Sequence, residues 1–191
     1  KYAKLPFKRL IQPAIDLAEN GYVISDAEAA SFNETKNEFI KLNTTLPIFV
    51  KNIPWKGGDT LVQKDLANTL KRIRENGLAG FYEGETARLF VEEMKKGNGI
   101  ITAADLKNYK PIIRKPTSFA YRGNTVVTMP LSSSGGIILE QMMKMSSFEN
   151  IDTMKFETPE SVQLMTEIER RAYADRAKYL GDPDFVKVPV K

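Results

Sequence analysis

The spacing of apolar residues changes near residue 111, and this change divides the chain. In residues 1–110 apolar side chains recur three and four positions apart, as in the series Leu66, Leu70 and Ile73. That period places them on one face of a helix, so this part is predicted to be helical. In residues 111–191 a β-branched, partly alternating stretch, 112–129, precedes two further helical patterns. The predicted fold class is therefore α+β, mostly helical, with one short sheet element.

Start and stop signals place the individual elements. Glycines that follow apolar-periodic segments end three of the predicted helices, and capping-box pairs begin two others. The helices are expected at residues 6–20, 25–42, 62–76 and 84–96, with a short turn of helix from Thr102. Residues 43–58 hold two prolines and two glycines and are predicted to be a loop in which Trp55 is a packed anchor.

The second part is predicted to hold a hairpin and two helices. Arg122-Gly123-Asn124 is a turn signal between strands at 112–121 and 125–129. Helices are expected at 137–147 and from Thr158-Pro159 to Gly181, the latter being the longest. A lone two-stranded hairpin is marginally stable in water. It must either pack on these helices or belong to a larger sheet whose other strands are not in this chain.

Two absent residue types restrict the chemistry. The chain has no histidine, which excludes a Ser-His-Asp triad, a histidine base and imidazole metal ligands within it. It has no cysteine, which excludes thiol catalysis and Cys-based metal sites. Metal sites built on histidine or cysteine are therefore not expected in this chain.

Charge and hydropathy exclude two classes of partner. Basic minus acidic residues are 8 − 6 in residues 1–56, 9 − 8 in 57–110 and 11 − 10 in 111–191, so the net charge of +4 is dispersed. A nucleic-acid binder concentrates its basic charge, so no nucleic-acid partner is expected. No apolar run approaches the ~20 residues of a membrane span.

The chain begins at Lys1 without methionine, which leads us to expect a processed or trimmed product.

Two groups of residues are candidates for a functional role. Ser133, Ser134, Gly135 and Gly136 lie between a predicted strand and a predicted helix, where backbone N–H groups can hold an anion. The structural interpretation is favoured, in which the serines cap the helix that begins near Ile137 and the glycines allow close packing. The long helix offers charged pairs three and four residues apart, Glu167 with Arg170 and Arg171 with Asp175, which are expected to be structural.

Eight short motifs, in the same order, resemble the γ-glutamyltranspeptidase family, also called glutathione hydrolases. These motifs are Gln12–Ala18, Gln63–Ala67, Gly80–Gly84, Thr102–Leu106, Tyr121–Gly123, Met129–Gly136, Ala172–Arg176 and Tyr179–Val186. The resemblance extends over about residues 1–191. One departure is Pro130-Leu131-Ser132, where the family usually has a run of prolines.

The resemblance implies that this chain is the C-terminal part of a large subunit. Family members are precursors that cleave themselves into two subunits and share a four-layer αββα sandwich of N-terminal-nucleophile hydrolases. Residues 1–110 would be a helical part, and residues 111–191 would hold the hairpin and further helices. The nucleophile is the threonine that begins the small subunit, and its free amine is the base. It would lie beyond Lys191, as would the oxyanion-hole glycines, and the arginine that holds the substrate's α-carboxylate would precede Lys1.

The resemblance therefore assigns no catalytic residue to this chain, and no binding residue is assigned either. The implied partners are the small subunit of the same precursor and a small γ-glutamyl substrate, with no cofactor and a periplasmic or secreted location if the source is bacterial. Ser133, Ser134, Gly135, Gly136, Tyr173, Asp175 and Arg176 are expected to be scaffold residues. The alternative is a non-catalytic helical module that packs against a partner chain.

Overall fold

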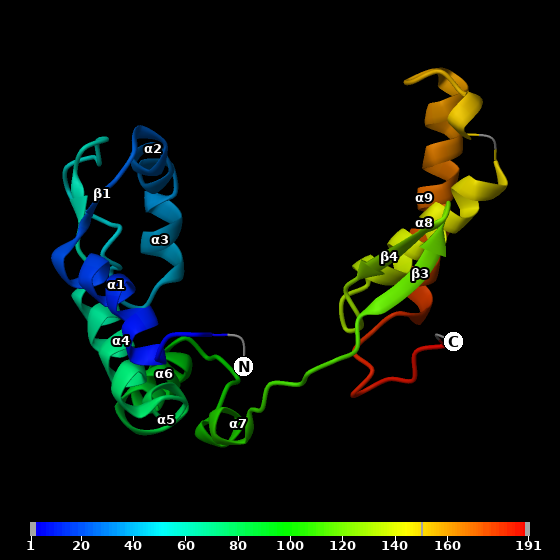
Figure 1. Cartoon of the computed structure of the whole chain (residues 1–191). Coiled ribbons are helices and arrows are strands. Elements are labelled where there is room, and N and C mark those ends of the chain that lie inside the picture. The colour runs from blue at the N-terminus through cyan, green and yellow to red at the C-terminus, as the bar shows by residue number, and fades with distance from the viewer. Residues whose placement is uncertain (1–2, 150, 190–191) are drawn as a thin grey trace. The chain divides into compact units, whose positions relative to one another are not determined.

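A computed structural model describes residues 3–149 and 151–189. The chain divides into two compact units, residues 1–110 and 111–191 (Figure 1). Helices make up more than half of the first unit and just under half of the second, and each unit contains one two-stranded antiparallel sheet among its described residues. No helix in the described ranges is both long and apolar enough to cross a membrane.

The first unit contains seven helices and two short strands among its described residues. They are α1 (Phe7–Asn20), β1 (Tyr22–Val23), α2 (Asp26–Glu34), α3 (Lys36–Leu42), β2 (Thr60–Leu61), α4 (Lys64–Asn76), α5 (Ala79–Tyr82), α6 (Gly84–Lys96) and α7 (Ala103–Asn108). The predicted helix boundaries are confirmed to within two residues for α1, α4 and α6. Glycines 21, 77 and 97 follow these three helices as predicted.

The core of this unit lies where α1, α2, α4 and the small sheet meet. Ile15, Ile24 and Leu61 are its fully buried large side chains. Ala18 of α1 and Ala67 of α4 are also buried, and such small side chains allow two helices to approach closely. β1 and β2 were not predicted, because each is only two residues long and has no alternating pattern to reveal it.

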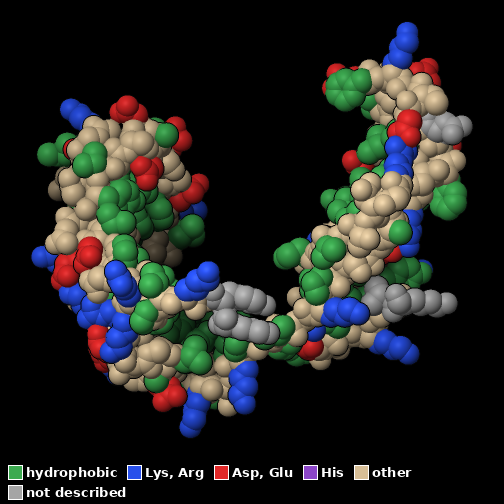
Figure 2. Space-filling view, in the orientation of Figure 1, with side chains coloured by type: hydrophobic (Ala, Val, Ile, Leu, Met, Phe, Trp, Pro, Cys, Tyr) green, Lys and Arg blue, Asp and Glu red, His purple; other side chains and the backbone are tan. Residues whose placement is uncertain are grey.

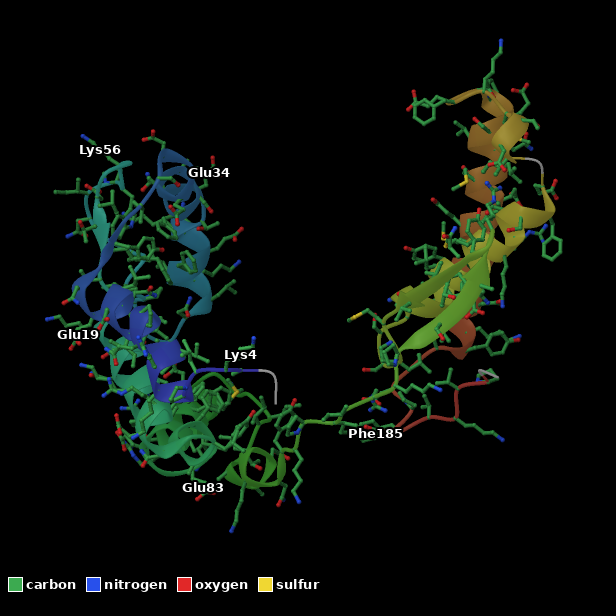
Figure 3. The ribbon with its side chains drawn as sticks, viewed as in Figure 1. Lys4, Glu19, Glu34, Lys56, Glu83 and Phe185 are labelled. Atoms are coloured by element: carbon green, nitrogen blue, oxygen red, sulfur yellow. The ribbon has the colours of Figure 1, made fainter. Side chains whose placement is uncertain are left out.

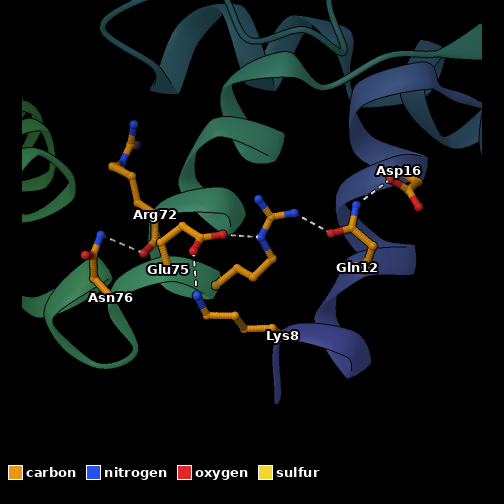
Figure 4. Close-up of polar contacts among 7 residues, drawn as sticks. Lys8, Gln12, Asp16, Arg72, Glu75 and Asn76 are labelled. Atoms are coloured by element: carbon orange, nitrogen blue, oxygen red, sulfur yellow. Dashed lines mark hydrogen bonds and ion pairs between the residues drawn. The ribbon is translucent and has the colours of Figure 1, made fainter. Parts of the chain in front are cut away.

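Polar side chains join α1 to α4 at the edge of this core (Figure 4). Lys8 Nζ donates to a Glu75 carboxylate oxygen at 2.6 Å, and Arg74 donates to both Glu75 and the side-chain carbonyl of Gln12. Gln12 in turn donates to Asp16 at 2.7 Å. These exposed and partly buried pairs orient the two helices, while burial of the apolar face between them supplies most of the stability.

The predicted helix 25–42 is interrupted at Thr35, where α2 ends and α3 begins. The Thr35 hydroxyl donates to the Ser31 carbonyl at 2.7 Å, a side-chain bond that bends helices. The capping box that begins α2 is confirmed, with the Ser25 hydroxyl accepting from the Glu28 N–H and the Glu28 carboxylate accepting from the Ser25 N–H.

Trp55 is a packed anchor in the loop, as predicted. Its ring lies edge-on to Phe32, with 5.8 Å between ring centroids, and its Nε1 donates to the Phe49 carbonyl at 2.8 Å. The Asn33 side chain donates to the Trp55 carbonyl and accepts from the Trp55 N–H. These contacts fix the loop against α2.

The second unit is a hairpin and two long helices. Its elements are β3 (Thr117–Tyr121), β4 (Asn124–Thr128), α8 (Gly135–Phe148), a 3₁₀ turn (Ile151–Thr153) and α9 (Pro159–Tyr179). The hairpin packs on α8 with Phe119 buried, and α8 packs along α9 (Figure 1). The hairpin therefore packs on a helix of this chain, which is the first of the two predicted arrangements.

The hairpin is shorter than predicted. Strand pairing begins with Thr117 opposite Thr128, so residues 112–116 are not a strand. Continuing the register would place Pro116 opposite Met129 and Lys115 opposite Pro130, and proline has no N–H for a ladder. The turn consists of Arg122 and Gly123, both with positive φ (48° and 78°), as a type I′ hairpin requires.

Large apolar side chains remain exposed in both units. Figure 2 shows hydrophobic side chains between charged ones on the visible face of each unit. Leu78 (73%) and Ile100 (91%) in the first unit and Phe148 (86%) and Phe156 (90%) in the second are among the most exposed. The core of each unit leaves these side chains uncovered.

Candidate functional site

The strand-to-helix turn after β4 differs from the prediction in the role of Ser134. α8 begins at Gly135, two residues before the expected Ile137, and its N-cap residue Ser134 makes no side-chain capping bond. The hydroxyl of Ser133 instead accepts from the Gly135 N–H at 3.4 Å. The predicted start near Ile137 is therefore confirmed to within two residues, and the predicted capping role is wrong for Ser134.

Gly136 is the position in this turn where no side chain fits. It is buried, and a Cβ there would lie 2.1 Å from the carbonyl oxygen of Met129. The same atom on Gly135 would meet only the Ser133 hydroxyl at 3.5 Å, an ordinary contact. The predicted close packing is therefore confirmed for Gly136 and belongs to that glycine rather than to both.

Residues of α9 complete the site by reaching the turn. Arg176 Nε donates to the Ser134 hydroxyl oxygen at 3.0 Å, across 42 residues of sequence. Arg176 and Tyr173 lie with Ser134, Gly135 and Ile138 around an open surface depression. The structure thus brings together the two motif groups that the sequence presents separately, with Ser134 as the point of contact.

Asp175 has a partner other than the one predicted. Its carboxylate accepts from Gln141 Nε2 on α8 at 2.9 Å. Among the described residues it forms no ion pair with Arg171, so the predicted Arg171–Asp175 pair is wrong. Asp175 faces α8, so it bonds Gln141 of that helix instead of Arg171 on its own helix.

The pair of Glu167 and Arg170 is present as predicted. Their closest N–O distance is 2.7 Å, and hydrogen bonds from the guanidinium lower the pKa of the Glu167 carboxyl. Both side chains are largely exposed. A pair of this kind contributes little to stability and gives no sign of a catalytic acid.

Sequence reasoning missed Gln141. It lies inside an apolar helix and has no motif partner nearby in sequence, so nothing marked it. In the structure it bonds Asp175 through Nε2, while its Oε1 is buried and has no hydrogen-bond partner among the described residues.

The assembled residues connect two helices and a turn through hydrogen bonds. No group of three or more acidic side chains that could hold a metal ion occurs within the described ranges. Ser133 and Ser134 have no histidine or lysine base bonded to them in those ranges.

Comparison with known proteins identifies the family. The sequence model of the family described as Gamma-glutamyltranspeptidase matches residues 1–191. The chain belongs to the γ-glutamyltranspeptidase family. The resemblance drawn from the motifs is thereby confirmed.

Three relatives illustrate the relationship. The glutathione hydrolase proenzyme of Escherichia coli K12 is 43% identical over 99% of this chain and 33% of the relative. The capsule biosynthesis protein CapD proenzyme of Bacillus anthracis is 38% identical over 98% of this chain and 34% of the relative. The crystal structure of Helicobacter pylori γ-glutamyltranspeptidase superposes with a TM-score of 0.91, at 40% identity, covering 98% of this chain and 54% of that one. The chain spans about a third of the length of the curated relatives it matches.

Proposed function

We propose that this chain is part of an enzyme that cleaves γ-glutamyl amide bonds, with glutathione or its conjugates as substrates. The observation that carries the proposal is the family match over residues 1–191, together with glutathione hydrolase relatives 38–43% identical across the whole chain. Because the chain spans only a third of those relatives, the activity is proposed for the parent protein.

In the proposed reaction, a threonine outside this chain attacks the γ-glutamyl carbonyl. The γ-glutamyl group becomes an ester on the threonine oxygen and the amine leaves; water or an amino acid then takes the γ-glutamyl group. The base is the threonine's own amine. This reaction needs no histidine, cysteine or cofactor, in keeping with a family chain that has neither residue.

This chain's part in the reaction is to position the rest of the protein. It is the C-terminal part of the large subunit, and its hairpin belongs to the αββα sandwich of the family. Ser133, Ser134, Gly135 and Gly136, with Tyr173, Asp175 and Arg176, form the scaffold described above. The small subunit of the precursor is its partner, and the exposed apolar side chains of each unit support such a partner. For a bacterial source the enzyme is placed in the periplasm or outside the cell.

The test compares this chain with its parent on γ-glutamyl-p-nitroanilide. The parent should release p-nitroaniline, and mass spectrometry of the quenched enzyme should find a γ-glutamyl group on threonine. The chain alone should give no turnover. A parent that matures but neither turns over nor acquires the γ-glutamyl group would contradict the proposal and favour a non-catalytic module.

A further inference from the structure

Residues 109–116 form an exposed segment without helix or strand, at the boundary between the two units. They have no helix or strand, and Tyr109, Ile112 and Ile113 are 62%, 62% and 95% exposed. An endopeptidase binds its substrate as an extended strand of several residues, which folded helices and sheets do not offer. This segment has no helix or strand that would have to unfold before an endopeptidase could bind it.

The segment contains three bonds that follow a basic residue, and proline blocks two of them. Pro111 follows Lys110, and Pro116 follows Lys115. Proline on the leaving side lacks an N–H and has a fixed φ, so trypsin-like enzymes do not cut before it. Only the Arg114–Lys115 bond is chemically open to an endopeptidase whose acidic specificity pocket selects arginine.

The side chain that such a pocket must capture is already bound. Arg114 Nη2 donates to Asp184 Oδ2 at 2.7 Å, and the Arg114 side chain is 29% exposed. Asp184 lies in the C-terminal tail next to Phe185, which is labelled in Figure 3. To be cut after Arg114, the chain must first break this ion pair.

A local turn fixes Asp184 in place. Its N–H donates to the side-chain carboxylate of Asp182 at 3.0 Å, and the Phe185 and Val186 N–H groups donate to the Asp182 carbonyl. These residues belong to the Tyr179–Val186 motif, which has no role in the packing of the helices described above or in the proposed reaction. The motif therefore presents an ordered carboxylate to Arg114.

We propose that Arg114–Lys115 is a cleavage site for trypsin-like endopeptidases and that Asp184 protects it. Cleavage adds one water to the peptide bond, which leaves a carboxylate on Arg114 and a free amine on Lys115. Residues 1–114, which include the whole first unit, are then no longer covalently joined to residues 115–191. The Asp182–Val186 turn holds the protecting Asp184 carboxylate in place. The proposal is independent of the γ-glutamyl chemistry.

The test is limited digestion of the 191-residue chain with trypsin, followed by intact-mass analysis. The first cut inside the chain should give residues 1–114 and 115–191, and Arg114→Gln should abolish it. Asp184→Asn should speed this cut about two- to fivefold, the range expected for loss of one exposed ion pair, and Asp184→Glu should restore protection. High salt should speed the cut in the native chain but not in Asp184→Asn.

A matched control removes an equivalent carboxylate from the same unit. Asp152→Asn breaks the ion pair with Arg122, at 2.6 Å, but leaves Arg114 untouched, so it should not change the rate. An earlier cut elsewhere, such as after Lys56, or an unchanged rate in a folded Asp184→Asn variant would overturn the proposal. Circular dichroism establishes that each variant is folded, because an unfolded chain would be cut at many sites at once.

Discussion

Arg176 on α9 donates a hydrogen bond to the hydroxyl of Ser134, the residue that immediately precedes α8. This bond joins two motifs that are separated by 42 positions in the sequence. It indicates that the serine motif and the Tyr173–Arg176 motif form one structural unit. If so, the two residues should be energetically coupled.

A double-mutant cycle measures that coupling. Ser134→Ala and Arg176→Ala should each reduce the free energy of unfolding, and the double variant should lose less than the sum, with a coupling of about 0.5–1 kcal/mol. The expected value is modest because the guanidinium is exposed. Arg170→Ala is the control, since Arg170 pairs with Glu167 on its own helix and should not couple to Ser134.

Neighbouring glycines should respond oppositely to the same added methyl group. Gly136→Ala should destabilise the chain by about 1–3 kcal/mol, because the new Cβ would overlap the Met129 carbonyl. Gly135→Ala should be neutral or stabilise by up to about 1 kcal/mol, because alanine is the better helix former and has room. Chemical denaturation of both variants is the measurement, and equal effects would show that the turn packs differently.

Because Asp175 accepts the hydrogen bond that joins α9 to α8, its replacement should lower the free energy of unfolding by an amount that depends on the new side chain. Asp175→Ala removes the acceptor for Gln141 and should cost about 0.5–1.5 kcal/mol, whereas Asp175→Asn retains an acceptor and should cost less. Melting temperatures of both variants are to be compared with that of Glu169→Ala, a change to an exposed acidic residue on the same helix. A larger loss from Glu169→Ala would contradict the assigned contact.

The capping box of α2 should make stability depend on pH in acid. Bonds from the Ser25 N–H and hydroxyl lower the pKa of Glu28 in the folded chain. A carboxyl with a lowered folded pKa stabilises the fold above its unfolded pKa, about 4.3, and loses that contribution as pH falls through the folded value. Melting temperature should therefore fall less between about pH 5 and pH 2 in Glu28→Gln, which does not titrate, than in the native chain. Parallel curves would contradict the assignment.

Sequence reasoning located the elements whose signals are local. The helix ends at Gly21, Gly77 and Gly97, the capping box at Ser25, and proline at the first position of α9 are all set by neighbours within four residues. The family was also recognisable, because its motifs are contiguous.

What the sequence did not reveal depends on contacts between distant residues. The β1–β2 pairing brings together Tyr22 and Leu61, and the partners of Asp175 and Arg176 lie on or beside α8. Arg171, four residues before Asp175, was a reasonable partner by spacing alone, but packing against α8 places Gln141 within reach of Asp175. No local sequence pattern shows whether Arg171 or Gln141 will bind Asp175.

We propose that Ser134, Gly136, Asp175 and Arg176 support the structure of the parent enzyme and take no part in its chemistry. The most direct measurement is steady-state kinetics of Arg176→Ala in the parent precursor, with active sites counted by γ-glutamyl trapping. Less self-cleavage or a lower melting temperature is expected, with kcat and KM of the matured fraction close to normal. Normal cleavage and melting with kcat reduced a hundredfold or more would contradict it.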